Sequence, residues 1–180
     1  TFAKALGSGV PCGALLAGSV RDAAVALVAV GLLAAGASAL NQVQEREDDR
    51  GLARTRRRPI PAGTVSAHQA GLVAGLLLVA GFVVLAVGGG AGAPLLPAFA
   101  ALVLYNGIYT PLKRVTAAAI LPGAVAGAIP PLIGAAVAGA IPLSAVVLAG
   151  AIMIWQVPHT WLIELQHRAD YVALPRPTFC

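Results

Sequence analysis

The sequence turns abruptly from apolar to charged in the segment AAVALVAVGLLAAGASAL-NQVQEREDDRG, residues 23–51. Residues 23–40 carry no charge, and a helix needs about 20 apolar residues to cross a bilayer. If this helix continues, Asn41, Glu45 and Asp49 recur at every fourth position and share one face. We expect it to end near Gly51, because glycine is common just past a helix. The segment predicts a transmembrane helix that ends in oxygen-bearing side chains.

The rest of the chain has the composition of a membrane protein. Of its 180 residues, 58% are hydrophobic and 11% charged, whereas roughly a quarter are charged in soluble domains. We predict an all-α polytopic bundle, 1–180, that forms a single domain and is truncated at both ends. Apolar runs predict about six spans, at 3–20, 23–44, 67–88, 94–111, 117–140 and 142–163.

Positive charge gathers in every second connection between the predicted spans. The connections 45–66 and 112–116 and the tail from residue 166 are basic, whereas 21–22, 88–93 and 140–142 carry only Arg21 and Asp22. By the positive-inside rule, we expect the basic connections to face the cytoplasm, with the chain in the inner membrane. We do not interpret the net charge of +5 as a nucleic-acid surface, because no soluble basic domain is present to form one.

The acids at 45–49 are followed closely by Arg54 and Arg58. Mg²⁺ favours a few carboxylates together with phosphate oxygens of a substrate. Arginine binds phosphate through paired, charge-assisted hydrogen bonds. A site for a diphosphate and its metal is one interpretation, and the spacing of the acids favours it. The other is a solvated loop whose arginines only mark the cytoplasmic side.

A second connection begins where Tyr105 and Tyr109 share a helix face, shortly before Lys113 and Arg114. These cations are expected at the same membrane level as the acids. The alternative is an aromatic belt at the interface with topogenic charges. Further along, the pair Pro130-Pro131 predicts a kink inside a span, and such kinks often border a cavity.

The last predicted span brings Trp155, His159 and Glu164 toward the same side. An ionisable group inside a membrane is a functional candidate by default, although a hydrogen bond to a neighbouring helix would equally explain His159. Asp170 follows the span, and it either faces the first acidic group or is simply solvated.

Five segments together resemble the UbiA-type membrane prenyltransferases, and most of all the branch that farnesylates heme. The match extends in order over nearly the whole chain. The segments are Asn41-x-x-x-Glu45-Arg46-x-x-Asp49, Arg54-Thr55-x-x-Arg58-Pro59-x-Pro61-x-Gly63, Tyr109-Thr110-x-x-Lys113-Arg114-x-Thr116, Gly127-Ala128-x-Pro130-Pro131-x-x-Gly134 and Trp155-x-x-Pro158-His159-x-Trp161, with Asp170-Tyr171 after them.

The resemblance implies a bundle of about nine spans around a lipid-open cavity. It implies transfer of a farnesyl group from farnesyl diphosphate to the vinyl group of heme B, which gives heme O. The implied roles are Mg²⁺ binding and catalysis by Asn41, Glu45, Asp49 and Asp170, diphosphate binding by Arg54, Arg58, Lys113 and Arg114, and contacts to the acceptor or carbocation by Tyr105, Tyr109, Trp155 and His159.

The chain departs from the family pattern at Glu47, where aspartate is usual, and in the residues after Asp170-Tyr171. Two alternatives stay open on the sequence alone. One is a UbiA-type enzyme with another acceptor, such as an aromatic quinone precursor. The other is a non-catalytic membrane scaffold or transporter.

Overall fold

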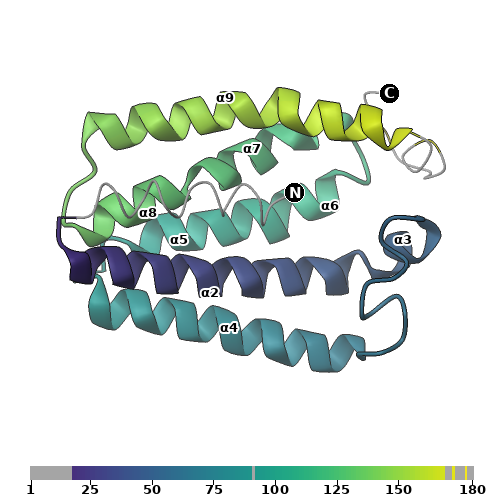
Figure 1. Ribbon diagram of the computed structural model, residues 1–180, viewed down its shortest axis with the longest axis horizontal. Coiled ribbons are helices and arrows are strands. Elements are labelled where there is room, and N and C mark those ends of the chain that lie inside the picture. Colours follow the sequence, from purple (N-terminus) through teal and green to yellow (C-terminus); the bar gives the residue numbers. More distant parts are fainter. Residues whose placement is uncertain (1–17, 91, 169–171, 173–176, 178–180) are drawn as a thin grey trace.

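The computed structural model describes residues 18–90, 92–168, 172 and 177. All regular elements in these residues are helical, and the long ones lie roughly along one axis (Figure 1). In chain order they are α2 (Val20–Gln44), α3 (Arg46–Gly51), α4 (Ala67–Gly88), α5 (Leu95–Leu102), the π-helix η1 (Val103–Tyr109), α6 (Thr110–Leu112), the 3₁₀-helix η2 (Ala117–Ala119), α7 (Ile120–Ala128), α8 (Pro130–Val137) and α9 (Leu143–Gln166).

These elements make 5 helical stretches long and apolar enough to cross a membrane, which confirms the all-α polytopic prediction. They are Val20–Gln44, Ala67–Gly88, Leu95–Leu112, Ala117–Val137 and Leu143–Gln166. The span predicted at 3–20 lies almost wholly outside the described residues. Arg21 and Asp22, expected in a connection, belong instead to the first turn of α2, where the Ser19 side chain accepts a hydrogen bond from the Asp22 backbone N–H.

Glycines allow α2 and α4 to pack closely along their lengths. A Cβ on Gly36 of α2 would lie 2.8 Å from Cγ of Leu78, and a Cβ on Gly81 of α4 would lie 2.7 Å from Cγ of Leu33. Any larger residue at these positions would push the helices apart. Lipid supplies little hydrophobic drive for helix association, so such close contact is a main source of stability in membranes.

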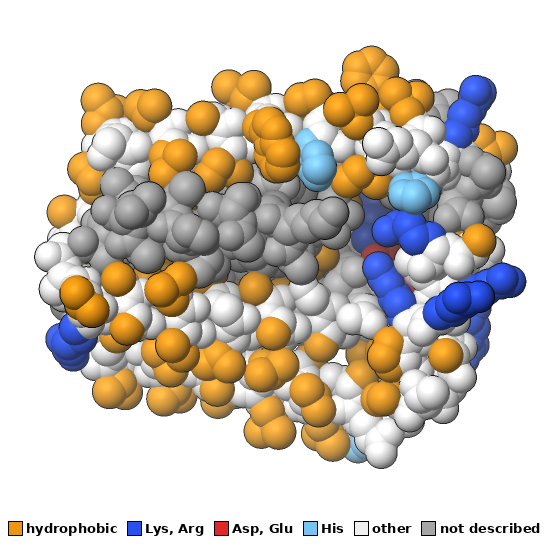
Figure 2. All heavy atoms as spheres, viewed as in Figure 1, with side chains coloured by type: hydrophobic (Ala, Val, Ile, Leu, Met, Phe, Trp, Pro, Cys, Tyr) orange, Lys and Arg blue, Asp and Glu red, His pale blue; other side chains and the backbone are white. Residues whose placement is uncertain are grey.

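The outward surface of the bundle is apolar. Large hydrophobic side chains such as Leu76, Val87 and Leu143 are more than two-thirds exposed, and orange side chains are spread along the upper and lower sides of the molecule in Figure 2. Blue cationic side chains gather mainly at the end of the molecule near α3. This pattern suits a protein whose sides face lipid and whose charged end faces water.

Two of the spans are interrupted. The fourth divides at Ile129 between α7 and α8, because Pro130 and Pro131 cannot donate the backbone hydrogen bonds that would continue α7. This confirms the kink predicted there. The third changes from α-helix to the wider π-helix η1 before it ends as α6. π-Helical turns are rare and often occur at functional sites.

The helix of the opening segment is also not continuous. Glu45 has φ −100° and ψ 7°, which separates α2 from α3. This corrects the expectation of one unbroken helix through Asp49. The end at Gly51 was predicted correctly.

Candidate active site

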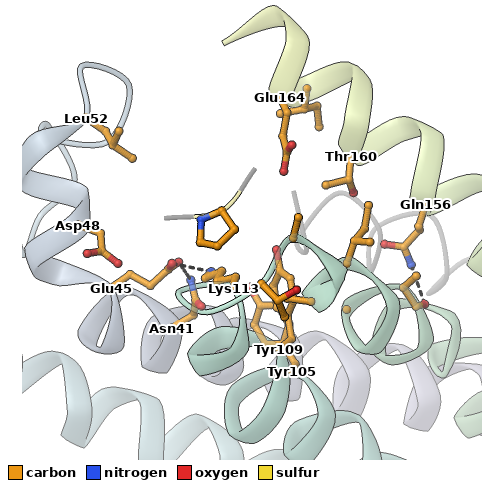
Figure 3. Close-up of a pocket in the computed structure, with 18 of the residues that line it drawn as sticks. Asn41, Glu45, Asp48, Leu52, Tyr105, Tyr109, Lys113, Gln156, Thr160 and Glu164 are labelled. Carbon is orange, nitrogen blue, oxygen red and sulfur yellow. Dashed lines mark hydrogen bonds and ion pairs between the residues drawn. The ribbon is translucent and has the colours of Figure 1, made fainter. Parts of the chain in front are cut away.

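A cavity of about 150 Å³ opens at the charged end of the bundle. Its walls come from the α2–α3 junction, the η1–α6 segment, α7 and α9 (Figure 3). The described residues that line it include acids, cations, two tyrosines and the polar side of α9: Asn41, Glu45, Asp48, Asp49, Arg54, Arg58, Tyr105, Tyr109, Lys113, Gln156, Thr160 and Glu164.

Asn41, Glu45 and Asp49 form one wall of the cavity, as their spacing predicted. All three are buried, and Asn41 Nδ2 donates a 2.7 Å hydrogen bond to Glu45 Oε2. The break at Glu45 does not separate them, because the backbone bonds from Glu45 N to Asn41 O and from Asp49 N to Glu45 O are both 2.9 Å long. The helical spacing therefore holds across the break.

Cations from other segments pair with these acids. Lys113 Nζ lies 2.5 Å from Glu45 Oε1, and both side chains are largely buried. Arg58 Nη1 lies 2.7 Å from Asp49 Oδ2. These contacts join the 52–66 connection to α3 and the end of α6 to the α2–α3 junction. The site thus holds acids and cations in alternation, already neutralising one another.

Arg54, Arg58 and Lys113 line the cavity, but Arg114 is not among its lining residues. The Arg114 guanidinium is half exposed; it lies 3.3 Å from Asp48 Oδ2 and donates to the Gln44 carbonyl oxygen at 2.7 Å. The structure thus places Arg114 apart from the other three cations that were expected to bind diphosphate. Its contacts fasten the end of α6 to the α2–α3 junction.

The π-helix η1 supplies the aromatic floor of the cavity. The Tyr105 and Tyr109 rings stack with centroids 5.6 Å apart, and Lys113 Nζ lies 4.8 Å from the Tyr109 centroid. The Thr110 hydroxyl lies 2.9 Å from Asn41 Oδ1 and 2.8 Å from the Tyr105 carbonyl oxygen, and it connects the floor to the acidic wall.

A Cβ on Gly123 would lie 2.9 Å from Cδ2 of Tyr109. Only glycine at this position allows α7 to approach the ring so closely.

The donor set suits Mg²⁺. The described residues contain no group of three or more His, Cys, Asp or Glu side chains close enough to hold a metal on their own. Mg²⁺ does not need one, because it usually binds one or two carboxylates and completes its shell with substrate phosphate and water. Glu45 and Asp49, with the Asn41 amide beside them, provide such a partial set. Asp170 lies outside the described residues.

Comparison with known proteins decides the family. The model of the UbiA prenyltransferase family matches residues 7–180. The chain belongs to this family. As a UbiA protein with several helices able to span a bilayer, it is an integral membrane protein.

Among its relatives, protoheme IX farnesyltransferase of Geobacter sulfurreducens is 48% identical over 157 residues, which cover 86% of this chain and 57% of the relative. The protein of the same name from Nitratidesulfovibrio vulgaris is 44% identical over 158 residues, with coverages of 85% and 54%. The chain therefore spans only a little over half the length of these curated relatives.

Solved structures agree on the UbiA fold. A UbiA homolog from Aeropyrum pernix K1, solved in the apo state, is 22% identical with a TM-score of 0.75; the match covers 92% of this chain and 64% of that one. A UbiA homolog from Archaeoglobus fulgidus bound to GPP and Mg²⁺ is 16% identical with a TM-score of 0.77, with coverages of 97% and 64%.

The α9 wall of this UbiA site differs from the sequence-based expectation. Trp155 and His159 stack on each other with centroids 4.4 Å apart, Trp155 is half exposed, and neither is among the lining residues. The helix instead turns Gln156, Thr160 and Glu164 toward the cavity (Figure 3). Gln156 and Thr160 were missed, although polar groups at i, i+4 and i+8 of an otherwise apolar span were a usable signal.

Proposed function

We propose that this chain transfers a farnesyl group from farnesyl diphosphate to the vinyl group of heme B, forming heme O. The observation that carries the proposal is the cavity in which buried acids, cations and stacked tyrosines from three separate segments meet. That combination suits the departure of a diphosphate and the capture of the cation left behind. The relatives named protoheme IX farnesyltransferase support heme as the acceptor.

Arg54, Arg58 and Lys113 are the groups that bind the diphosphate in this proposal. Each lines the cavity, and charge-assisted hydrogen bonds to phosphate oxygens are among the strongest in proteins. Asn41, Glu45 and Asp49 would hold Mg²⁺, with Asp170 as a further predicted ligand. When bound, Mg²⁺ would act as a Lewis acid that stabilises negative charge on the departing diphosphate. The UbiA homolog bound to GPP and Mg²⁺ supports this pairing of ligands.

The tyrosine floor suits the cationic stage of the reaction. The bond from farnesyl C1 to the diphosphate oxygen breaks, and its electron pair leaves with the diphosphate. The Tyr105 and Tyr109 rings line the cavity, and aromatic faces attract positive charge such as that of an allylic cation. The terminal vinyl carbon of heme B then bonds to C1 and leaves a cation on the carbon next to the porphyrin.

We also propose that the cavity opens toward the cytoplasm from the inner membrane. The proposal rests on the basic residues of the 45–66 and 112–116 connections, which lie at the same end as the cavity. Basic connections are retained on the cytoplasmic side during insertion.

The test of the proposed function is an assay of membranes that contain the protein, supplied with farnesyl diphosphate and heme B. We expect Mg²⁺-dependent release of diphosphate and the appearance of heme O in the extracted pigments. When heme B and an aromatic acid are both offered, formation of a prenylated aromatic acid in place of heme O would show that the acceptor is not heme. No diphosphate release under any condition would contradict prenyl transfer.

A further inference from the structure

One wall of the cavity carries polar side chains that are not needed to bind the diphosphate. Gln156, Thr160 and Glu164 lie at successive turns of α9 and line the cavity. In Figure 3 they face it from the side opposite Asn41 and Glu45. A carboxylate and two neutral groups are poorly suited to an anion. Polar side chains that point inward from a membrane helix usually serve a substrate pathway or a proton path.

The Gln156 amide is held in a defined orientation. Its Nε2 donates to the Ala124 carbonyl oxygen of α7 at 3.3 Å. The side chain lies against Gly127, where an added Cβ would overlap the amide. With the N–H side directed at α7, the amide oxygen points toward the cavity (Figure 3). This leaves a fixed hydrogen-bond acceptor on the wall away from the diphosphate-binding cations.

The proposed reaction needs such an acceptor at one step. Heme O has a hydroxyl on the carbon next to the porphyrin, so one water must add there after the vinyl group has bonded to the farnesyl carbon. Bulk water would quench the farnesyl cation earlier, so water must be excluded elsewhere. A neutral amide can hold one water by accepting its hydrogen bond. It is also a far weaker nucleophile than a carboxylate, which would capture the cation itself.

We propose that Gln156 positions the water that adds to the vinyl-derived cation, and that the proton released passes along α9 to Glu164. This inference rests on the proposed function. The water oxygen donates an electron pair to the cationic carbon and forms the C–O bond, and the oxygen then loses one proton. Thr160 lies one turn from Gln156 and one turn from Glu164, and its hydroxyl can accept one proton while donating another. The Glu164 carboxylate takes up the proton, so charge and atoms balance.

The test compares two variants that disturb the amide in different ways. Gln156→Leu removes the amide at similar size. Gly127→Ala keeps the amide but displaces it, and the fold tolerates this because the overlapping atoms are at the end of a flexible side chain. Gly150→Ala is the matched control, because a Cβ at Gly150 meets nothing within 4 Å. Membranes that contain each protein are given farnesyl diphosphate and heme B, and diphosphate and extracted hemes are quantified.

In both test variants we expect formation of the hydroxylated heme to fall about tenfold, as for the loss of one hydrogen bond to a reacting group. Diphosphate release should fall far less, and a farnesylated heme lighter by one water should accumulate. Gly150→Ala should match the wild type. An unchanged share of hydroxylated product in both variants would overturn the role of Gln156. So would complete loss of farnesylated heme in both, since the amide would then act before water addition. A wild type that makes no farnesylated heme would instead contradict the proposed function.

Discussion

Lys113 Nζ lies 2.5 Å from Glu45 Oε1 in a contact where both side chains are largely buried. The two residues come from different spans, and the same ammonium also lies over the Tyr109 ring. Asp49 and Arg58 form a second pair of this kind beside it. In the absence of ligand, the acids expected to hold the metal are therefore neutralised by the cations expected to hold the diphosphate.

This pairing predicts that Mg²⁺ and diphosphate strengthen each other's binding. Either ligand alone must separate the pairs and leave one partner buried without a counter-charge, which is costly. Both ligands together provide each group with a new partner. We expect saturating Mg²⁺ to raise the affinity for pyrophosphate by roughly 5- to 150-fold, the usual range of coupling between sites. Isothermal titration of the purified protein measures both affinities.

Glu45→Gln should reduce that coupling, because Lys113 then needs no separation from a carboxylate. Glu47→Gln is the control, since Glu47 is exposed and its ion pairs within the described part of the chain are with the surface residues Arg46 and Arg50. If the wild type bound pyrophosphate equally well with and without Mg²⁺, the acids and cations would not be exchanging their ion pairs for the two ligands, and the prediction would be wrong.

A second prediction separates two neighbouring acids. Asp49 is buried against Arg58, whereas Asp48 is more exposed and pairs with the surface residue Arg114. We expect Asp49→Asn to lower Mg²⁺-dependent heme O formation by about two orders of magnitude or more, because Lewis-acid stabilisation amounts to several kcal/mol. Asp48→Asn should cost far less, although Asp48 also lines the cavity. Heme O is quantified at membrane levels matched by immunoblot, and a larger loss for Asp48→Asn would reverse the assignment.

The third prediction concerns the arginines of the 52–66 connection. Arg54 lines the cavity and Arg56 is not among its lining residues, although both are exposed cations two positions apart. We expect Arg54→Ala to weaken binding of farnesyl diphosphate roughly ten- to hundredfold, the effect of losing charge-assisted hydrogen bonds worth about 1.5–3 kcal/mol. Arg56→Ala should stay within about twofold, because a screened surface charge contributes little. Similar losses in both would indicate a general field of positive charge instead of a specific contact.

A fourth prediction tests the orientation in the membrane. Ala62 and Ala140 are exposed residues in connections at opposite ends of the bundle. In a background with Cys12 and Cys180 changed to Ser, Ala62→Cys should resist a membrane-impermeant thiol reagent added outside intact cells. Ala140→Cys should react. The reverse pattern of labelling would place the cavity on the outer side.

How far the sequence predicted the site depended on the kind of residue. The face of Asn41, Glu45 and Asp49 followed from helical spacing, and it survived the break at Glu45 because the backbone hydrogen bonds continue across it. The rotation of α9 about its axis was harder to predict. Its own side chains are apolar on nearly every face, so the sequence gives little sign of which face is directed inward. The sequence therefore offered Trp155 as a possible contact to the acceptor or carbocation and did not single out Gln156.

The ion pairs were also beyond the sequence alone. Arg58 and Lys113 are both basic residues that follow a helix, and nothing local shows which acid each one meets. Arg114 follows Lys113 directly, yet it contacts Asp48, which is more exposed than Glu45 and Asp49. Such pairings depend on how the spans are placed beside one another, and that placement depends on close contacts such as Gly36 with Leu78.

The π-helix η1 divides the third span into two halves, and it sets how far the second half is rotated about the helix axis relative to the first. Before it, α5 packs against the apolar core; after it, Thr110 and Lys113 face the acidic wall. An α-helix through the same 7 residues would wind further than η1 does, by about one residue or about 100°, and would turn everything beyond it. Lys113 would then rotate away from Glu45 while the core-facing half of the span kept its contacts. The wide turn therefore sets the orientation of the residues that contact the acidic wall relative to the half of the span that packs in the core.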